Sequence, residues 1–217
     1  MIINRKIVPA GIGTNPNKNM AAIKYITIHN TGNYNAGATA QMHANLQYNG
    51  NKDADGKSRQ ASWHYTVDDK EIWQSFEDNQ MCWHAGDGNG NGNSSSIGIE
   101  ICDNDKSKFV QACENAAWLT ASLLTKYGLT AGNIKQHHDW SGKDCPKELR
   151  AGTWEINWGT FIQRVWYFMK NIPDTWAKES WQWGIDKGIT TGERPKDAAT
   201  RQEIMKILYD YDKQISL

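Results

Sequence analysis

Short runs of β-branched and aromatic residues, separated by turn residues, recur along the first part of the chain. Residues 23–29 (IKYITIH) form one such run, and the Asn-Thr-Gly-Asn that follows is typical of a turn. This pattern predicts a buried strand that ends at His29. Residues 62–67 and 71–76 flank the polar tripeptide Asp-Asp-Lys, which predicts two strands joined as a hairpin.

A period of two in the apolar positions predicts a further strand over residues 97–104. Its isoleucines share one side, so Glu100 faces the opposite side. The preceding stretch, residues 85–96 (AGDGNGNGNSSS), is too rich in Gly and Asn to form a regular element, and it predicts an exposed loop.

Apolar residues at helical spacing predict three longer helices. The second of these helices ends before Gly128, where a C-terminal stop is expected. Trp118 and Trp166 fall on the apolar faces of the second and third helices and are expected in the core, whereas His43 is expected at the surface. The predicted helices span residues 36–48, 109–127 and 158–170.

The order of these elements predicts the fold class. Strands interleaved with helices favour an α/β domain over residues 1–170, with a central mixed β-sheet flanked by helices. Pro173 marks a break after this domain. Residues 171–217 are too few for a large core of their own, so we expect a small helical module there.

Charge and composition exclude several classes of protein. The 217 residues include 24 Lys plus Arg and 24 Asp plus Glu, so no net field favours nucleic acid or an anionic membrane. No apolar run approaches the roughly 20 residues of a spanning helix, and the beginning of the chain does not resemble a signal peptide. We therefore expect no membrane insertion, and synthesis in the cytoplasm without a recognisable signal peptide.

Histidine and cysteine point to metal chemistry in the first domain. The four cysteines are sparse and form no CxxC pair, so free or metal-bound thiols are expected rather than a disulfide framework. Imidazole and thiolate are preferred zinc ligands, and a loop over residues 136–146 places Cys145 near both His137 and His138. His29, at the end of a predicted core strand, is the candidate for a third ligand. Spacing alone does not choose between His137 and His138.

Four stretches of the chain form a joint pattern: ITIHNTGN (26–33), SWHYTVDDKEIWQ (62–74), WHAGDG followed by SIGIEIC (83–102) and HHDWSGKDCP (137–146). They resemble motifs that occur together, and in the same order, in the zinc amidases of phage endolysins, bacterial autolysins and peptidoglycan recognition proteins. Over roughly residues 1–170 the chain resembles this family, the type 2 N-acetylmuramoyl-L-alanine amidases. The resemblance implies hydrolysis, by zinc-activated water, of the amide between the lactyl group of N-acetylmuramic acid and the L-alanine of the stem peptide.

The resemblance also implies roles for individual residues. In the family the last stretch has its His and Cys ligands eight residues apart, which selects His137 over His138. Asp139 either hydrogen-bonds a metal-bound imidazole or caps a turn. The implied roles are zinc ligation by His29, His137 and Cys145, general-base catalysis by Glu100, oxyanion stabilisation by Lys143 and substrate binding by His64, Trp83 and His84.

Residues 171–217 resemble a single S-layer homology motif, a module that attaches proteins to cell-wall polymers; their tryptophans either form a wall-binding face or pack inside the module. We expect a zinc-dependent peptidoglycan hydrolase, a phage or prophage endolysin that acts on the bacterial cell wall. The first alternative is a peptidoglycan-binding protein without hydrolytic activity, which in this family typically lacks the thiolate ligand. The second is a zinc-stabilised structural protein, which needs a fourth protein ligand.

Overall fold

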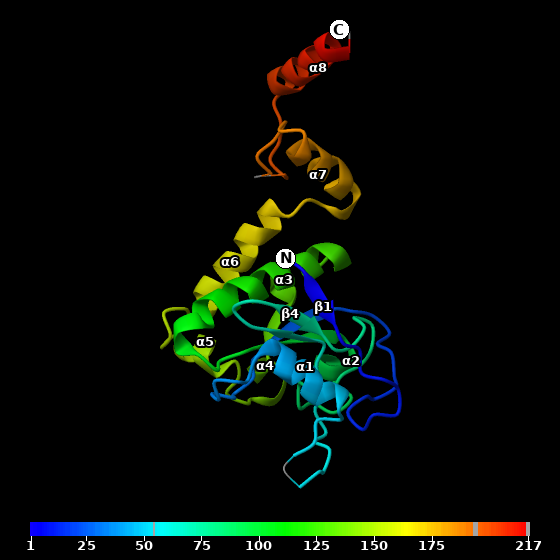
Figure 1. The fold of residues 1–217 in the computed structure, drawn as a ribbon, viewed down its shortest axis with the longest axis vertical. Helices are drawn as coiled ribbons and strands as arrows, with labels where there is room; N and C mark the ends of the chain where they lie inside the picture. The colour runs from blue at the N-terminus through cyan, green and yellow to red at the C-terminus, as the bar shows by residue number, and fades with distance from the viewer. Residues whose placement is uncertain (54, 193–194, 216–217) are drawn as a thin grey trace. The chain divides into compact units, whose positions relative to one another are not determined.

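The computed structural model describes residues 1–53, 55–192 and 195–215 (Figure 1). The chain divides into two compact units, residues 1–169 and 170–217. Every strand described lies in the first unit, and the C-terminal unit is helical where it is described. None of the described helices is both long and apolar enough to cross a membrane.

A mixed six-stranded sheet forms the centre of the first unit. β3 and β4 pair antiparallel as the predicted hairpin, and the other neighbouring pairs described are parallel. The prediction of an α/β domain with a mixed sheet is therefore confirmed. The strands, in their spatial order, are β1 (Ile3–Arg5), β4 (Ile72–Gln74), β3 (Tyr65–Val67), β5 (Ser96–Ile101), β2 (Tyr25–Asn30) and β6 (Ile134–Gln136).

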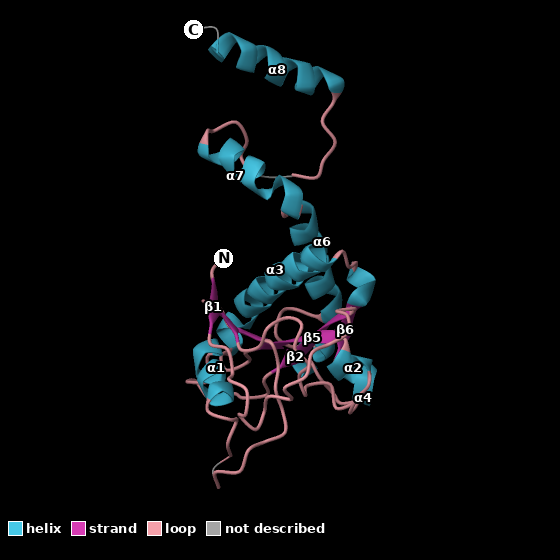
Figure 2. Ribbon diagram, turned by 90° about the vertical axis from the view of Figure 1, so that its right-hand side faces the viewer, coloured by secondary structure: helices cyan, strands magenta, loops and turns pink. Residues whose placement is uncertain are grey.

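The two faces of the sheet differ in chemistry because side chains alternate along each strand. The isoleucines of β2 and β5 are fully buried on one face, against helix α3 (Phe109–Tyr127). His29 and Glu100 are register partners on the other face, where α1 (Ala40–Tyr48) packs beside β3 and β4. Figure 2 shows α3 and α1 on opposite sides of the strands. Burial of the isoleucine face, at about 1.5–3 kcal/mol for each side chain, is a main source of stability.

Helix α3 has the bounds that its sequence predicts. Gly128 caps its C-terminus in the left-handed conformation (φ 64°), which glycine adopts without steric cost. Helix α6 (Trp158–Asn171) joins α3 through an ion pair between Arg164 Nε and Glu114 Oε1 at 2.8 Å. The remaining helices are α2 (Asn91–Ser94), α4 (His138–Ser141), α5 (Lys147–Ala151), α7 (Lys178–Asp186) and α8 (Arg201–Ile215), with 3-10 turns at Lys106–Lys108, Ala131–Asn133 and Thr175–Ala177.

Two side chains lie elsewhere than the helical pattern predicts. His43 is 4% exposed rather than at the surface, because its Nδ1 donates to the Thr39 carbonyl and its ring lies beside Cys102. Trp166 is 49% exposed rather than in the core. It directly follows Val165 in the chain and so points about 100° away from the buried stripe of α6.

The Gly- and Asn-rich stretch at residues 85–96 is not the exposed loop that its composition predicts. It contains the short helix α2, and the side chain of Asn93 within it is 2% exposed. Strands β1 and β6, each only three residues long, were not predicted. They form because β4 and β2 offer them parallel partners, a contact that local composition does not encode.

Asp78 links the hairpin to the end of α3. This side chain is 7% exposed, and its carboxylate accepts four hydrogen bonds of 2.5–3.2 Å. Burial raises the pKa of Asp78, but the donors lower it more, so the net pKa lies below its ordinary value. The donors are Tyr65, Gln74, Lys126 and Tyr127.

We predict that Asp78→Asn lowers the free energy of unfolding by about 1.5–3 kcal/mol at pH 7, because a charged acceptor is lost from a buried network. A depressed pKa stabilises the native state fully above the unfolded pKa, near 4, and this contribution is lost as pH falls through the native pKa. Urea unfolding at pH 7, 5 and 3 should show the difference between parent and variant shrinking at pH 3. Glu77→Gln, at an exposed neighbouring carboxylate, is the control and should change little.

A pH-independent difference for Asp78→Asn would contradict the assignment of its effect to the carboxylate charge. An equal effect of Glu77→Gln would contradict the importance of burial at residue 78.

Candidate active site

Three side chains from distant parts of the chain meet on the polar face of the sheet. The Nδ1 atoms of His29 and His137 lie 3.0 Å apart, and Cys145 Sγ lies 3.8 Å from His29 Nδ1. All three residues are buried, and their possible ligand atoms lie within 4.8 Å of one another. The group contains His137, the histidine that the family spacing implies, and not His138.

Parallel strand pairing explains how the chain brings these residues together. β6 pairs with β2 up to Gln136, so the next residue, His137, emerges beside His29 at the same end of the sheet. The His137 backbone N–H donates to the Ile28 carbonyl at 3.3 Å. Cys145 is held there in turn, because its carbonyl accepts from the His138 N–H at 2.9 Å.

Burial keeps both imidazoles in the form that binds metals. It is the largest cause that lowers the pKa of His29 well below its ordinary value, and the neighbouring His84 and His137 lower it further. Burial, then Lys143, lowers the pKa of His137 to about 4. Both rings are therefore neutral at neutral pH, and each has one nitrogen lone pair available for a cation.

The donor set fits a zinc ion. Tetrahedral zinc, with bonds of about 2.0–2.3 Å, places its nitrogen and sulfur ligands roughly 3.3–3.6 Å apart, which is close to the separations found here. Burial and then Glu100 raise the pKa of the Cys145 thiol to about 12, so a cation is needed to ionise it at neutral pH. Three protein ligands would leave a fourth position open, the arrangement of catalytic rather than structural zinc.

Glu100 lies beside this cluster without joining it. Its Oε1 is 4.0 Å from His29 Nδ1, its side chain is 14% exposed, and its buried Oε2 has no hydrogen-bond partner within the described residues. Burial raises the pKa of Glu100 to about 8, against the opposing effect of Lys143 and with reinforcement from Asp103. Such a carboxyl group can exchange a proton near neutral pH.

A cleft of about 670 Å³ opens onto the cluster, and a neighbouring cavity of about 510 Å³ shares the Glu100 and Lys143 side chains with it. The cleft therefore has room on both sides of the proposed reacting groups. Its lining includes Gln60, Ala61, Trp63, Trp83, His84, Gly86, Gly88, Asn93, Glu100, His137, Ser141 and Lys143.

The residues expected to bind substrate separate into two groups. Trp83 and His84 line the cleft as expected. His64 is fully buried beneath it instead, because its Nδ1 accepts from the Gly98 N–H at 3.0 Å and its Nε2 donates to the Gln80 carbonyl at 2.8 Å. Both nitrogens are thus bonded to the backbone, and His64 is not among the residues that line the cleft.

Sequence reasoning missed Asn93, although it lines the cleft. Its Oδ1 accepts from the backbone N–H groups of both His84 and Ala85 at 2.8 Å. No local signal distinguishes this asparagine from the others in its Gly- and Asn-rich stretch. Asp139 caps a turn by accepting from the Gln136 N–H at 2.8 Å, which is one of the two roles considered for it.

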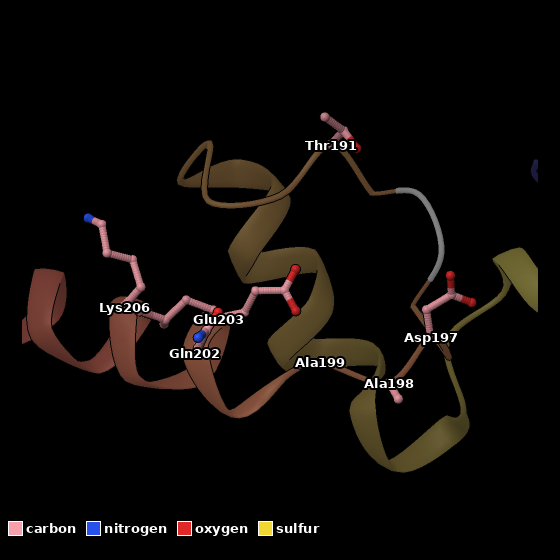
Figure 3. Close-up of a pocket in the computed structure, with 8 residues that line it drawn as sticks. Thr191, Asp197, Ala198, Ala199, Gln202, Glu203 and Lys206 are labelled. Atoms are coloured by element: carbon pink, nitrogen blue, oxygen red, sulfur yellow. The ribbon is translucent and has the colours of Figure 1, made fainter.

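The C-terminal unit has a cavity of its own, of about 670 Å³ (Figure 3). Gln202, Glu203 and Lys206 of α8 line it, together with Thr191 and Asp197 from the segment between α7 and α8. Residues 146–217 contain no histidine and no cysteine, so the metal chemistry argued above belongs to the first unit.

Comparison with known proteins identifies the family. Residues 19–148 match the family model described as N-acetylmuramoyl-L-alanine amidase. The chain belongs to this family. It is 44% identical over 153 residues to N-acetylmuramoyl-L-alanine amidase XlyA of Bacillus subtilis, covering 70% of this chain and 48% of XlyA. It is 39% identical over 179 residues to N-acetylmuramoyl-L-alanine amidase CwlH of the same species, covering 82% of this chain and 64% of CwlH.

The fold of this amidase family member also matches solved structures. A mutant endolysin from Bacillus subtilis superposes with a TM-score of 0.67 at 41% sequence identity, over 76% of this chain and 99% of that one. The chain thus spans about half to two thirds of the length of the two curated relatives, but nearly all of the solved endolysin chain.

We predict that the parent chain binds one zinc ion and that Cys145→Ser weakens the affinity by roughly 100-fold or more, because a hydroxyl is a far poorer zinc ligand than a thiolate. Competition with a chelating dye measures the affinity. Cys113→Ser, at a fully buried cysteine of α3 outside the cluster, is the control and should leave the affinity unchanged. Unaltered zinc affinity in Cys145→Ser would remove Cys145 from the ligand set.

Proposed function

We propose that this amidase is a zinc-dependent peptidoglycan hydrolase that cleaves the bond between the N-acetylmuramic acid lactyl group and the L-alanine of the stem peptide. The observation that carries this proposal is the buried cluster of His29, His137 and Cys145, with Glu100 beside it at the floor of an open cleft. Membership of the amidase family and relatives named N-acetylmuramoyl-L-alanine amidase support it.

Zinc held by these three side chains would supply a Lewis acid and lower the pKa of a coordinated water to about 7. Glu100, whose carboxylate lies 4.0 Å from the imidazole of His29, accepts the proton of the attacking water and passes it to the leaving amine of L-alanine. The Lys143 ammonium, on the same cleft, stabilises the negative charge that develops on the scissile carbonyl oxygen. Trp83 forms part of the wall along which the glycopeptide binds.

Two alternatives are less well supported. A protein that only binds peptidoglycan has no need of a buried thiol facing two imidazoles, and family members of that kind typically lack this cysteine. A structural zinc site needs a fourth protein ligand, and the described His, Cys, Asp and Glu side chains supply three within reach of one ion.

The biological role that we propose is lysis of a bacterial cell wall by an endolysin. The similarity to a solved Bacillus subtilis endolysin supports it.

For the C-terminal unit we propose attachment to the wall, as the resemblance to an S-layer homology motif implies. Trp176 is 86% exposed and Trp183 is 51% exposed, and aromatic rings of this kind stack on sugars.

Analysis of the digestion products tests the proposed reaction. Digestion of peptidoglycan by the zinc-loaded chain should release new L-alanine amino termini without new reducing sugar ends. Reducing ends without amino termini would show a glycosidase and overturn the proposal.

Glu100→Gln keeps the size of the side chain and should lower turnover by roughly 10²-fold or more while zinc stays bound. Near-normal turnover in this variant would remove Glu100 from the reaction.

Shortening the chain tests the proposed role of the C-terminal unit. A form that ends at residue 170 should cleave soluble muropeptides at the parent rate, because the cluster and cleft lie in the first unit. Its lysis of intact walls should fall, as measured by turbidity, together with its co-sedimentation with walls. Parent-level lysis of intact walls would contradict wall attachment by residues 171–217.

A further inference from the structure

One loop contacts both imidazoles of the proposed metal cluster. We propose that residues 84–93 position the metal ligands: the His84 side chain orients His29, and the Ala85 carbonyl orients His137. The inference rests on the proposed metal site and assigns His84 a role as a positioning residue rather than a substrate-binding one.

Hydrogen bonds fix which nitrogen of His29 faces the metal. The Ser96 carbonyl can only accept, so the hydrogen of His84 in their 3.2 Å contact is on Nε2. His84 Nδ1 is thereby left as an acceptor, and it lies 3.0 Å from His29 Nε2. His29 therefore carries its hydrogen on Nε2, and its Nδ1 lone pair points to His137 and Cys145.

The same loop orients the second imidazole. His137 Nε2 lies beside the Ala85–Gly86 segment, 3.5 Å from where a Cβ at residue 86 would stand, and the Ala85 carbonyl, as a hydrogen-bond acceptor, raises the pKa of His137 against the stronger lowering by burial. His137 Nδ1 faces His29, so the donor is Nε2, which also lies on the side of Gly86. Both ligands thus present Nδ1 to the same point and donate their Nε2 hydrogens outward, the usual arrangement around a protein-bound metal.

The positioning groups are themselves held rigidly. Asn93 accepts from the N–H groups of His84 and Ala85, and its amide donates to the Gly88 carbonyl at 2.9 Å. The Asp87 carboxylate accepts from the N–H groups of Gly92 and Asn93. These bonds give the loop one defined conformation in spite of its glycines.

Gly98 lets the His84 ring lie against strand β5. A Cβ atom at residue 98 would come within 2.8 Å of His84 Cγ, closer than packed atoms approach.

Both His84 nitrogens are already bonded, to Ser96 and to His29, so the ring has no remaining hydrogen bond to offer a substrate.

His84→Phe in the full chain tests the inference, because phenylalanine keeps a planar ring but cannot accept from His29 Nε2. The dissociation constant for zinc, measured by chelator competition on the folded protein, should rise 10–100-fold. His64→Phe is the matched control. His64 is also buried, its ring meets the His84 ring edge to face, and its described hydrogen bonds go to the backbone, so its replacement should leave the zinc dissociation constant within about twofold. His84→Asn, whose side-chain oxygen can take the place of Nδ1, should recover part of the lost affinity.

Equal zinc affinity in the parent and His84→Phe, or an equal loss in His64→Phe, would overturn the inference while leaving the metal site intact. A parent chain that binds no zinc would instead overturn the proposed function. Nitrogen-15 spectra of the metal-free parent give a second measurement that needs no variant to fold. They should show His29 protonated on Nε2, and protonation on Nδ1 would overturn the inference.

Discussion

Parallel pairing of β2 with both β5 and β6 is the constraint on which the site depends. It sets His29 opposite Glu100 and starts the loop of His137 and Cys145 from the same end of the sheet. A register shift of one residue would turn His29 and Glu100 to the isoleucine face. Burial of those isoleucines against α3 therefore holds the register and, through it, the geometry of the proposed reacting groups.

Burial of the cluster lowers the stability of the native fold. Two imidazoles, a thiol and a carboxyl group are buried together, and the Glu100 Oε2 has no partner within the described residues. Buried polar atoms without partners destabilise a native state by about 1–3 kcal/mol each. Hydrogen-bonded networks outside the cleft, such as the four donors on Asp78, offset this cost.

The sequence predicted those elements that are encoded by a pattern of neighbouring residues. The alternation of residues 97–104 and the Gly128 stop correspond to β5 and to the end of α3. Strands β1 and β6 were missed because pairing, rather than composition, creates them. The order of the family motifs was enough to name the three residues that the structure brings together, but not to distinguish the roles of neighbouring histidines. His64 and His84 occupy similar motifs, and only their long-range partners separate a structural residue from a positioning one.

The proposed metal ligands His29 and Cys145 are 116 positions apart in the sequence. A zinc ion between them would act as a reversible cross-link that closes most of the first unit into one loop. A ligand that binds only the native state adds about 2.7 kcal/mol of stability when its free concentration is 100 times its dissociation constant. The proposed catalytic ion would then also stabilise the native state against unfolding and proteolysis. Loss of zinc would lower activity and protease resistance together.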